Sequence, residues 1–168
     1  MKKCIYLLLL SLCFNCNPLY EEYKNLNKEI SKSKLYKEQL KILRPILSKQ
    51  KKPVILIINW KKNILKKDGS LYYSALLYDS SNKKIGLFRT TEKKPEVVIA
   101  TEDLSDNHFK ELLHILDNYL NGNEAYLLSL QDSFSCSEST PYYIYDFIKN
   151  KKLEINSFFF NKDGKIIQ

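Results

Sequence analysis

Residues 54–58 form an unbroken apolar run, Val-Ile-Leu-Ile-Ile, directly after Pro53. A short run that is rich in β-branched residues is typical of a strand, and the absence of polar alternation indicates that both of its faces are buried. We therefore expect a β-sheet that contains a strand shielded from water on both sides.

Further segments of the chain have the composition of strands. Residues 70–79 and 85–91 flank the polar stretch Ser-Ser-Asn-Lys-Lys and are predicted to pair as a hairpin. Residues 96–100 form a fourth predicted strand, and residues 124–130 form a fifth.

The C-terminal residues 141–168 are dense in Tyr, Ile and Phe and contain two turn signals, Lys-Asn-Lys-Lys and Asn-Lys-Asp-Gly. They predict a three-stranded meander, since an Asp-Gly pair favours the tight turn of a hairpin. A helix over residues 141–149 is the alternative for the first part of this segment.

Residues 18–43 are predicted to form one long helix that continues as a short turn to about residue 50. Its two apolar stripes, both at 4-3-4 spacing, consist of Leu19, Tyr23, Leu26 and Ile30 and of Tyr36, Leu40, Leu43 and Leu47. Pro45 is expected to kink or restart the helix, because proline lacks an amide donor. The helix either stands as a stalk or packs on the sheet, and its apolar stripes favour packing.

Residues 104–121 are predicted to form an amphipathic helix. Its apolar stripe comprises Phe109, Leu112, Leu113, Leu116 and Leu120. Ser105 is a suitable N-cap, and Gly122 can end the helix in the left-handed conformation. The predicted elements together indicate an α+β fold with a long N-terminal helix, a mostly antiparallel sheet of about six to eight strands, and one further amphipathic helix.

The N-terminal residues MKKCIYLLLLSLCFNC begin with Lys2 and Lys3 and continue with a run from Cys4 to Phe14 that is apolar except for Ser11. As a helix this run would measure about 16 Å, which is too short for a hydrocarbon core of about 30 Å. A basic start followed by a short apolar run is typical of a secretory signal peptide.

Residues 12–16, Leu-Cys-Phe-Asn-Cys, resemble the lipobox of a bacterial lipoprotein, in which a small residue precedes an acylated cysteine. The resemblance implies removal of residues 1–15, fatty acylation of Cys16, and attachment to a membrane of the cell envelope on its extracytoplasmic side. An ordinary cleaved signal and an N-terminal core strand are the alternatives. The rest is expected to comprise a helical segment, residues 16–52, and a single α+β domain, residues 53–168.

The chain carries a formal net charge of +8, which can attract nucleic acid, anionic lipid or an acidic partner. Its only arginines are Arg44 and Arg89, whereas recognition of bases and phosphates favours the bidentate fork of arginine. Predicted export also separates the protein from cytoplasmic nucleic acid. We therefore expect no nucleic-acid partner. The positive charge is expected to belong to a solvated surface, with attraction to an anionic membrane or envelope polymer as the alternative. The expected contacts are with a membrane through the lipid anchor and with an envelope protein or polysaccharide.

The residues with chemical potential form no recognised catalytic or metal-binding motif. His108, Glu111 and His114 recur at three-residue steps, whereas a zinc-binding helix places two histidines four residues apart. Cys136 lies in a Ser-rich stretch, and nothing in the sequence places a base beside it. The acidic residues 102–103 precede a helix, where they complement its dipole. We expect no catalytic residue, metal or cofactor; a small envelope hydrolase that uses His108, Glu111 or Cys136 is the alternative.

Aromatic residues of the predicted meander are the candidate binding residues. Because neighbouring residues of a strand face opposite ways, part of the set Tyr142, Tyr143 and Tyr145 is expected at the surface. Exposed tyrosines stack on sugars or join protein interfaces, although core packing would also use them. We therefore expect a non-catalytic, membrane-anchored envelope lipoprotein that binds a partner.

Overall fold

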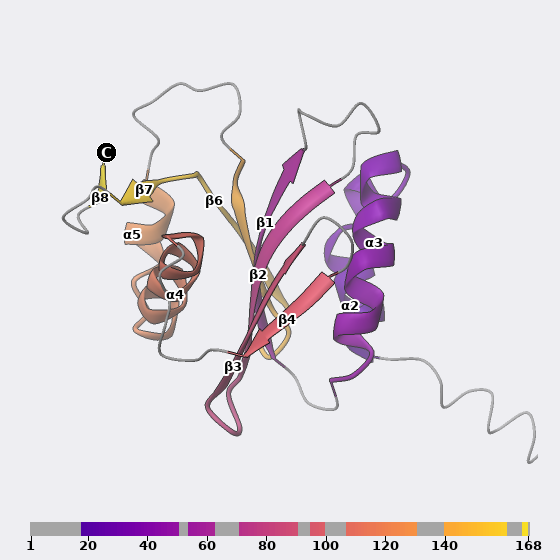
Figure 1. The fold of residues 1–168 in the computed structure, drawn as a ribbon, viewed down its shortest axis with the longest axis horizontal. Helices are drawn as coiled ribbons and strands as arrows, with labels where there is room; N and C mark the ends of the chain where they lie inside the picture. The colour runs from indigo at the N-terminus through magenta and orange to yellow at the C-terminus, as the bar shows by residue number, and fades with distance from the viewer. Residues whose placement is uncertain are drawn as a thin grey trace, which may run out of the picture. The chain divides into compact units, whose positions relative to one another are not determined.

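The computed structural model describes residues 18–50, 54–62, 71–90, 95–99, 107–130, 140–160 and 166–167. The chain divides into two units, Met1–Pro53 and Val54–Gln168, and each is described by itself. Figure 1 shows the elements that make up each unit.

The described residues of the first unit, 18–50, form two α-helices, α2 (Pro18–Leu26) and α3 (Lys34–Leu47), separated by the single-turn 3-10 helix η1 (Lys28–Ile30). The prediction of one long helix is therefore wrong. The break has a local cause. The Asn27 side chain donates to the Tyr23 carbonyl at 2.8 Å, and the Ser33 hydroxyl accepts from the Tyr36 amide at 3.1 Å. Ser33 is thus an N-cap that begins a new helix.

Pro45 does not end α3, which continues through it to Leu47. A proline within a helix removes one amide donor, and the carbonyl left without this donor belongs to Lys41, four residues earlier. Both Lys41 and Pro45 are exposed, so water can solvate that carbonyl. The helix therefore does not restart at Pro45, and the predicted kink stays a prediction.

An aromatic stack joins the two helices of the first unit. The rings of Tyr23 in α2 and Tyr36 in α3 lie 6.3 Å apart with nearly parallel planes. Both side chains are buried, as are Leu19, Leu43 and Leu47 of the predicted stripes. The stripes thus identify buried faces of the two helices even though the helix boundary was predicted incorrectly.

The second unit is built on a six-stranded antiparallel sheet with the order β4-β3-β2-β1-β5-β6 (Figure 1). Its strands are β1 (Ile55–Lys62), β2 (Leu71–Asp79), β3 (Lys84–Thr90), β4 (Pro95–Ile99), β5 (Tyr142–Asp146) and β6 (Lys151–Ile155). Strand β1 pairs with β2 on one side and β5 on the other. Its residues Ile55 to Ile58 are at most 3% exposed, which confirms the strand predicted to be buried on both faces.

Two predicted hairpins are present in the sheet. Strands β2 and β3 flank a turn at residues 80–83, where the Asp79 side chain accepts from the amides of Ser81 and Asn82. Strand β5 forms the second hairpin with β6, so residues 142–146 adopt the predicted strand and not the alternative helix. The next two strands, β7 (Phe159–Phe160) and β8 (Ile166–Ile167), pair with each other outside this sheet.

The predicted fold is wrong in its strands as well as in its N-terminal helix. Residues 124–130 form the helix α5 (Glu124–Ser129) and not a strand. Leu127 and Leu130 are buried, whereas Leu128 is 51% exposed. A strand would place residues 128 and 130 on one face, but helical spacing separates them. Among the described residues after β4, two segments are therefore α-helical, and β7 and β8 form a separate pair instead of completing a single-sheet meander.

The helix α4 (Asn107–Leu120) lies with α5 on one side of the sheet (Figure 1). Its buried hydrophobic side chains are those of Phe109, Leu112, Ile115, Leu116 and Tyr119. They join one hydrophobic core with the strand residues Ile55, Ile57, Leu76, Leu87, Ile144 and Ile155. No helix in the described part of the chain combines the length and the apolarity needed to cross a membrane.

Candidate functional site

Two buried carboxylates lie between α4 and β5. Glu111 on α4 is 3% exposed, and Asp146 on β5 is 1% exposed. Each accepts a hydrogen bond from a tyrosine of the other element. The Tyr142 hydroxyl on β5 donates to Glu111 Oε2, and the Tyr119 hydroxyl on α4 donates to Asp146 Oδ2 at 2.7 Å. We call these four residues the α4–β5 seam.

The seam depends on a match between helix and strand geometry. Glu111 and Tyr119 are eight residues apart, which corresponds to a rise of about 12 Å along a helix. Tyr142 and Asp146 are four residues apart, which corresponds to about 13 Å along a strand. Both pairs can therefore form at once only when α4 and β5 run in the same direction along the seam. The arrangement fixes the position of the helix along the strand.

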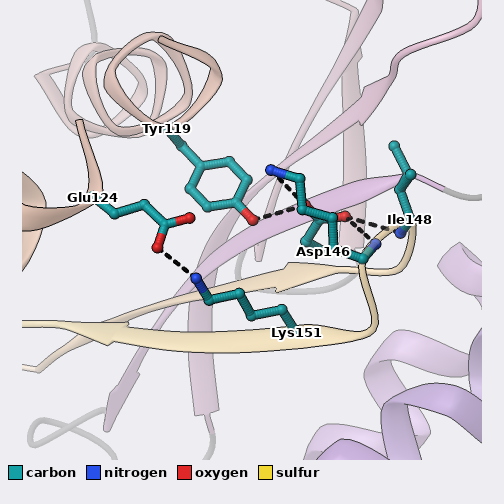
Figure 2. A network of polar contacts seen from close by, with 6 residues as sticks. Tyr119, Glu124, Asp146, Ile148 and Lys151 are labelled. Atoms are coloured by element: carbon teal, nitrogen blue, oxygen red, sulfur yellow. Dashed lines mark hydrogen bonds and ion pairs between the residues drawn. The ribbon is translucent and has the colours of Figure 1, made fainter. Parts of the chain in front are cut away.

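Asp146 also organises the turn that follows β5. Its Oδ1 accepts from the backbone amides of Ile148 at 2.9 Å and Lys149 at 3.0 Å, while its Oδ2 accepts from Tyr119 (Figure 2). A side chain that accepts from amides two and three residues later stabilises a turn. The same carboxylate thus joins the helix α4 to the β5–β6 hairpin.

Two lysines near the turn lie next to acidic groups. Lys151 on β6 forms an ion pair with Glu124 at the start of α5 (Figure 2). The Lys149 ammonium lies 3.9 Å from Asp146 Oδ2 and 5.1 Å from the centre of the Tyr119 ring. These contacts connect α4 and α5 to the β5–β6 hairpin. They also place a cation beside the buried carboxylate of Asp146.

The environment of the seam favours neutral tyrosines. Burial raises the pKa of the Tyr142 hydroxyl, and the negative charge of Glu111 and the hydrogen bond to it raise the pKa further. Burial likewise raises the pKa of Tyr119, with added contributions from Asp146 and Glu124. Both phenols therefore remain protonated at neutral pH and act as hydrogen-bond donors. This arrangement holds carboxylates in place and does not generate a phenolate nucleophile.

His114 lies on α4 near the seam but has different partners. Its Nε2 is 3.1 Å from the Tyr126 hydroxyl of α5 and 3.2 Å from Asn118 Nδ2. Its ring packs edge-on against Phe158 at 5.8 Å. Burial lowers the pKa of His114, although the charge of Asp117 opposes this effect. A neutral imidazole in these contacts links α4 to α5.

The structure places one of the proposed hydrolase residues in the interior. Glu111 is the buried acceptor of the seam, and the backbone of His108 belongs to the first turn of α4. Cys136, Cys16 and the acidic pair at residues 102–103 lie outside the described residues. Within the described part of the chain, no cluster of three or more His, Cys, Asp or Glu side chains could hold a metal ion.

The candidate binding tyrosines divide between the two faces of β5. Tyr142 faces α4 and is 4% exposed, whereas Tyr143 and Tyr145 stack on the opposite face with ring centres 6.4 Å apart. Tyr145 is buried at 2% exposure, and Tyr143 is half-buried. The Lys152 ammonium of β6 lies 5.2 Å from the Tyr143 ring centre. Tyr143 is thus the member of the set with the most access to solvent.

Sequence reasoning missed Tyr119 and Asp146, which complete the seam. The sequence holds an acidic residue and a tyrosine at matching rises on the helix and on the strand, but this pattern does not identify a contact by itself. Without the topology, nothing showed that these two elements are neighbours.

The sequence matches no family model, and neither a curated protein nor a solved structure matches the chain. Function is therefore inferred from the residues themselves.

Proposed function

We propose that the protein is a lipoprotein of the bacterial cell envelope, anchored through acylated Cys16, whose folded part binds an envelope protein or polysaccharide. The observation that carries this proposal is the order of features at the N-terminus. Lys2 and Lys3 precede a short apolar run, and Cys16 follows it. A run of this length suits a signal peptide better than a membrane span.

Acylation would supply the membrane affinity that such a chain needs after its signal is removed. Each buried methylene of an acyl chain contributes about 0.8 kcal/mol, and two or more chains on one residue anchor stably. The mature protein would then remain on the extracytoplasmic surface of its membrane.

The burial and the contacts of Glu111 favour a binding role over a catalytic one. Its carboxylate is buried and accepts from Tyr142, so its contacts stabilise the packing of α4 on β5. A general acid or base must reach the proton that it transfers. A hydrolase that relies on Glu111 would need to open this seam.

The half-buried ring of Tyr143, next to Lys152, is the part of the predicted tyrosine set that suits a ligand contact. An aromatic face beside a cation can stack on a sugar and attract an acidic group at the same time. An acidic envelope polysaccharide has both features, and we propose Tyr143 as a contact residue for such a partner.

Anchoring can be tested by membrane fractionation of the native host expressing the full chain with Cys16→Ser. Because this variant lacks the acceptor thiol, the processed protein should no longer be found in the membrane fraction, or the protein should accumulate with its signal peptide attached. Cys4→Ser is the matched control, because it removes a thiol of the predicted signal that lies outside residues 12–16 and should leave anchoring unchanged. Normal processing and anchoring of the Cys16→Ser protein would contradict the proposal.

A further inference from the structure

One face of α3 carries an unbroken stripe of positive charge. Lys34, Lys37, Lys41 and Arg44 are all exposed and follow 3-4-3 spacing. At 100° per residue they occupy an arc of about 80° and extend for about 15 Å along the helix. Glu38, the acidic residue of α3, lies outside this arc. We call the four basic residues the α3 cationic face.

The lysine side chains of this face have no polar partner among the residues that the structure describes. Elsewhere, Lys24 pairs with Glu21 at 2.8 Å and Lys151 pairs with Glu124. In contrast, the side-chain ammonium groups of Lys34, Lys37 and Lys41 form no ion pair or hydrogen bond with a described residue. Three adjacent cations therefore remain available to an external anion.

The cationic face lies close to the proposed anchor along the chain. Pro18 begins α2 two residues after Cys16, a separation of at most about 7 Å. The Tyr23–Tyr36 stack then holds α3 against α2 in the same unit. An anchor at Cys16 would keep this unit at the membrane surface, where anionic headgroups are concentrated.

We propose that the α3 cationic face binds the anionic headgroups of the membrane that carries the protein. The proposal rests on the proposed anchoring at Cys16 for its location, and on charge complementarity for the choice of partner. A juxtamembrane cluster of lysines and arginines gains affinity for an anionic surface with each added charge. Three of the four residues are lysines, which act as point charges and suit mobile phosphate headgroups better than the geometric reading of bases.

The proposed headgroup contact would involve only one side of α3, because another side is buried in the first unit. Tyr36, Leu43 and Leu47 are buried on the side opposite the cationic face. Headgroup binding would therefore orient the first unit on the membrane without exposing its apolar residues. The lipid anchor would supply attachment, and the cationic face would supply orientation.

The test measures co-sedimentation of the full chain with vesicles of phosphatidylcholine, with and without phosphatidylglycerol. All proteins carry Cys16→Ser, so acylation is absent and residues 1–15 contribute equally to each. Lys34→Gln, Lys37→Gln and Lys41→Gln together should weaken binding to the anionic vesicles roughly a hundredfold, at about fivefold for each charge. Binding to vesicles without phosphatidylglycerol should not change. Arg44 is retained because it also lies 5.9 Å from the Tyr20 ring centre.

A matched control removes three exposed lysines of the second unit, through Lys83→Gln, Lys84→Gln and Lys110→Gln. The control should retain most of its affinity for the anionic vesicles. Equal losses in both triple variants, or no loss in the α3 variant, would overturn the proposal. Binding to a DNA duplex that depends on the α3 lysines, without such dependence on vesicles, would also overturn it. Since no step requires acylation, a failure of anchoring at Cys16 leaves this result unaffected.

Discussion

Two tyrosine hydroxyls hold two buried carboxylates in place along the α4–β5 seam. A buried carboxylate is costly unless donors surround it, because water no longer solvates its charge. Tyr142 supplies such a donor to Glu111, and Tyr119 supplies one to Asp146. Glu111, the acidic residue that the alternative hydrolase prediction named, is therefore part of the packing between a helix and a strand.

Removal of one seam hydroxyl should destabilise the protein. Tyr142→Phe deletes the donor to Glu111 and should lower the free energy of unfolding by about 1–3 kcal/mol at pH 7, measured by urea denaturation. Tyr78→Phe is the control, since Tyr78 is a half-buried tyrosine on β2 without a side-chain hydrogen bond to a described residue. Equal stabilities of the two variants would show that the Tyr142 hydrogen bond contributes nothing.

The same substitution should change how stability depends on alkaline pH. The pKa of Tyr142 is raised in the folded state, so its stabilising contribution is complete below the unfolded value of about 10 and decreases as the pH rises above it. The unfolded chain then releases a proton that the folded chain retains, and stability falls by about 1.4 kcal/mol per pH unit for this group. Tyr142→Phe should show a slope that is less steep by that amount above pH 10. An unchanged slope would contradict the buried, protonated state of Tyr142.

At the scale of elements, α4 is the helix with the clearest sequence pattern, but its predicted apolar stripe differs from its buried face. The predicted stripe included Leu112, which is fully buried, and Leu120, which is 49% exposed. It omitted Ile115 and Tyr119, both of which are buried. The buried face of α4 is therefore wider than the stripe and ends before Leu120.

Alanine substitutions at Leu112 and Leu120 should distinguish a buried from an exposed position of α4. Leu112→Ala should lower the free energy of unfolding by about 2–5 kcal/mol, because it leaves a cavity in the core. Leu120→Ala removes the same atoms from an exposed position and should change stability by less than about 0.5 kcal/mol. Both values can be measured by thermal or chemical denaturation followed by circular dichroism. Comparable losses would mean that α4 packs differently.

The sequence predicted those elements that have a clear local signal, such as an apolar run or turn residues. The run at residues 54–58 identified β1, and turn residues located the β2–β3 hairpin. Residues 124–130 were wrongly predicted to form a strand, because a short apolar segment is compatible with either a strand or a helix. Ser33 was overlooked as a cap, so two helices were merged into one. The α4–β5 seam was beyond prediction, since it depends on the alignment of two elements that are distant in the sequence.

At the scale of the whole molecule, the chain divides into two units, for which we propose different roles beside a lipid anchor. The first unit, next to Cys16, carries the α3 cationic face and is proposed to contact headgroups. The second unit, built on the six-stranded sheet, is proposed to bind an envelope partner. Both roles depend on the protein being held at a membrane after export, so anchoring at Cys16 is the central claim.

The intact mass of the mature protein purified from its own host tests that claim most directly. Acylation predicts a chain that begins at Cys16 and carries the added mass of a diacylglyceryl group. A chain that begins at another residue, or one that begins at Cys16 with an unmodified thiol, would contradict it. A disulfide between Cys16 and Cys136 would contradict it equally, because the acceptor thiol would then be occupied.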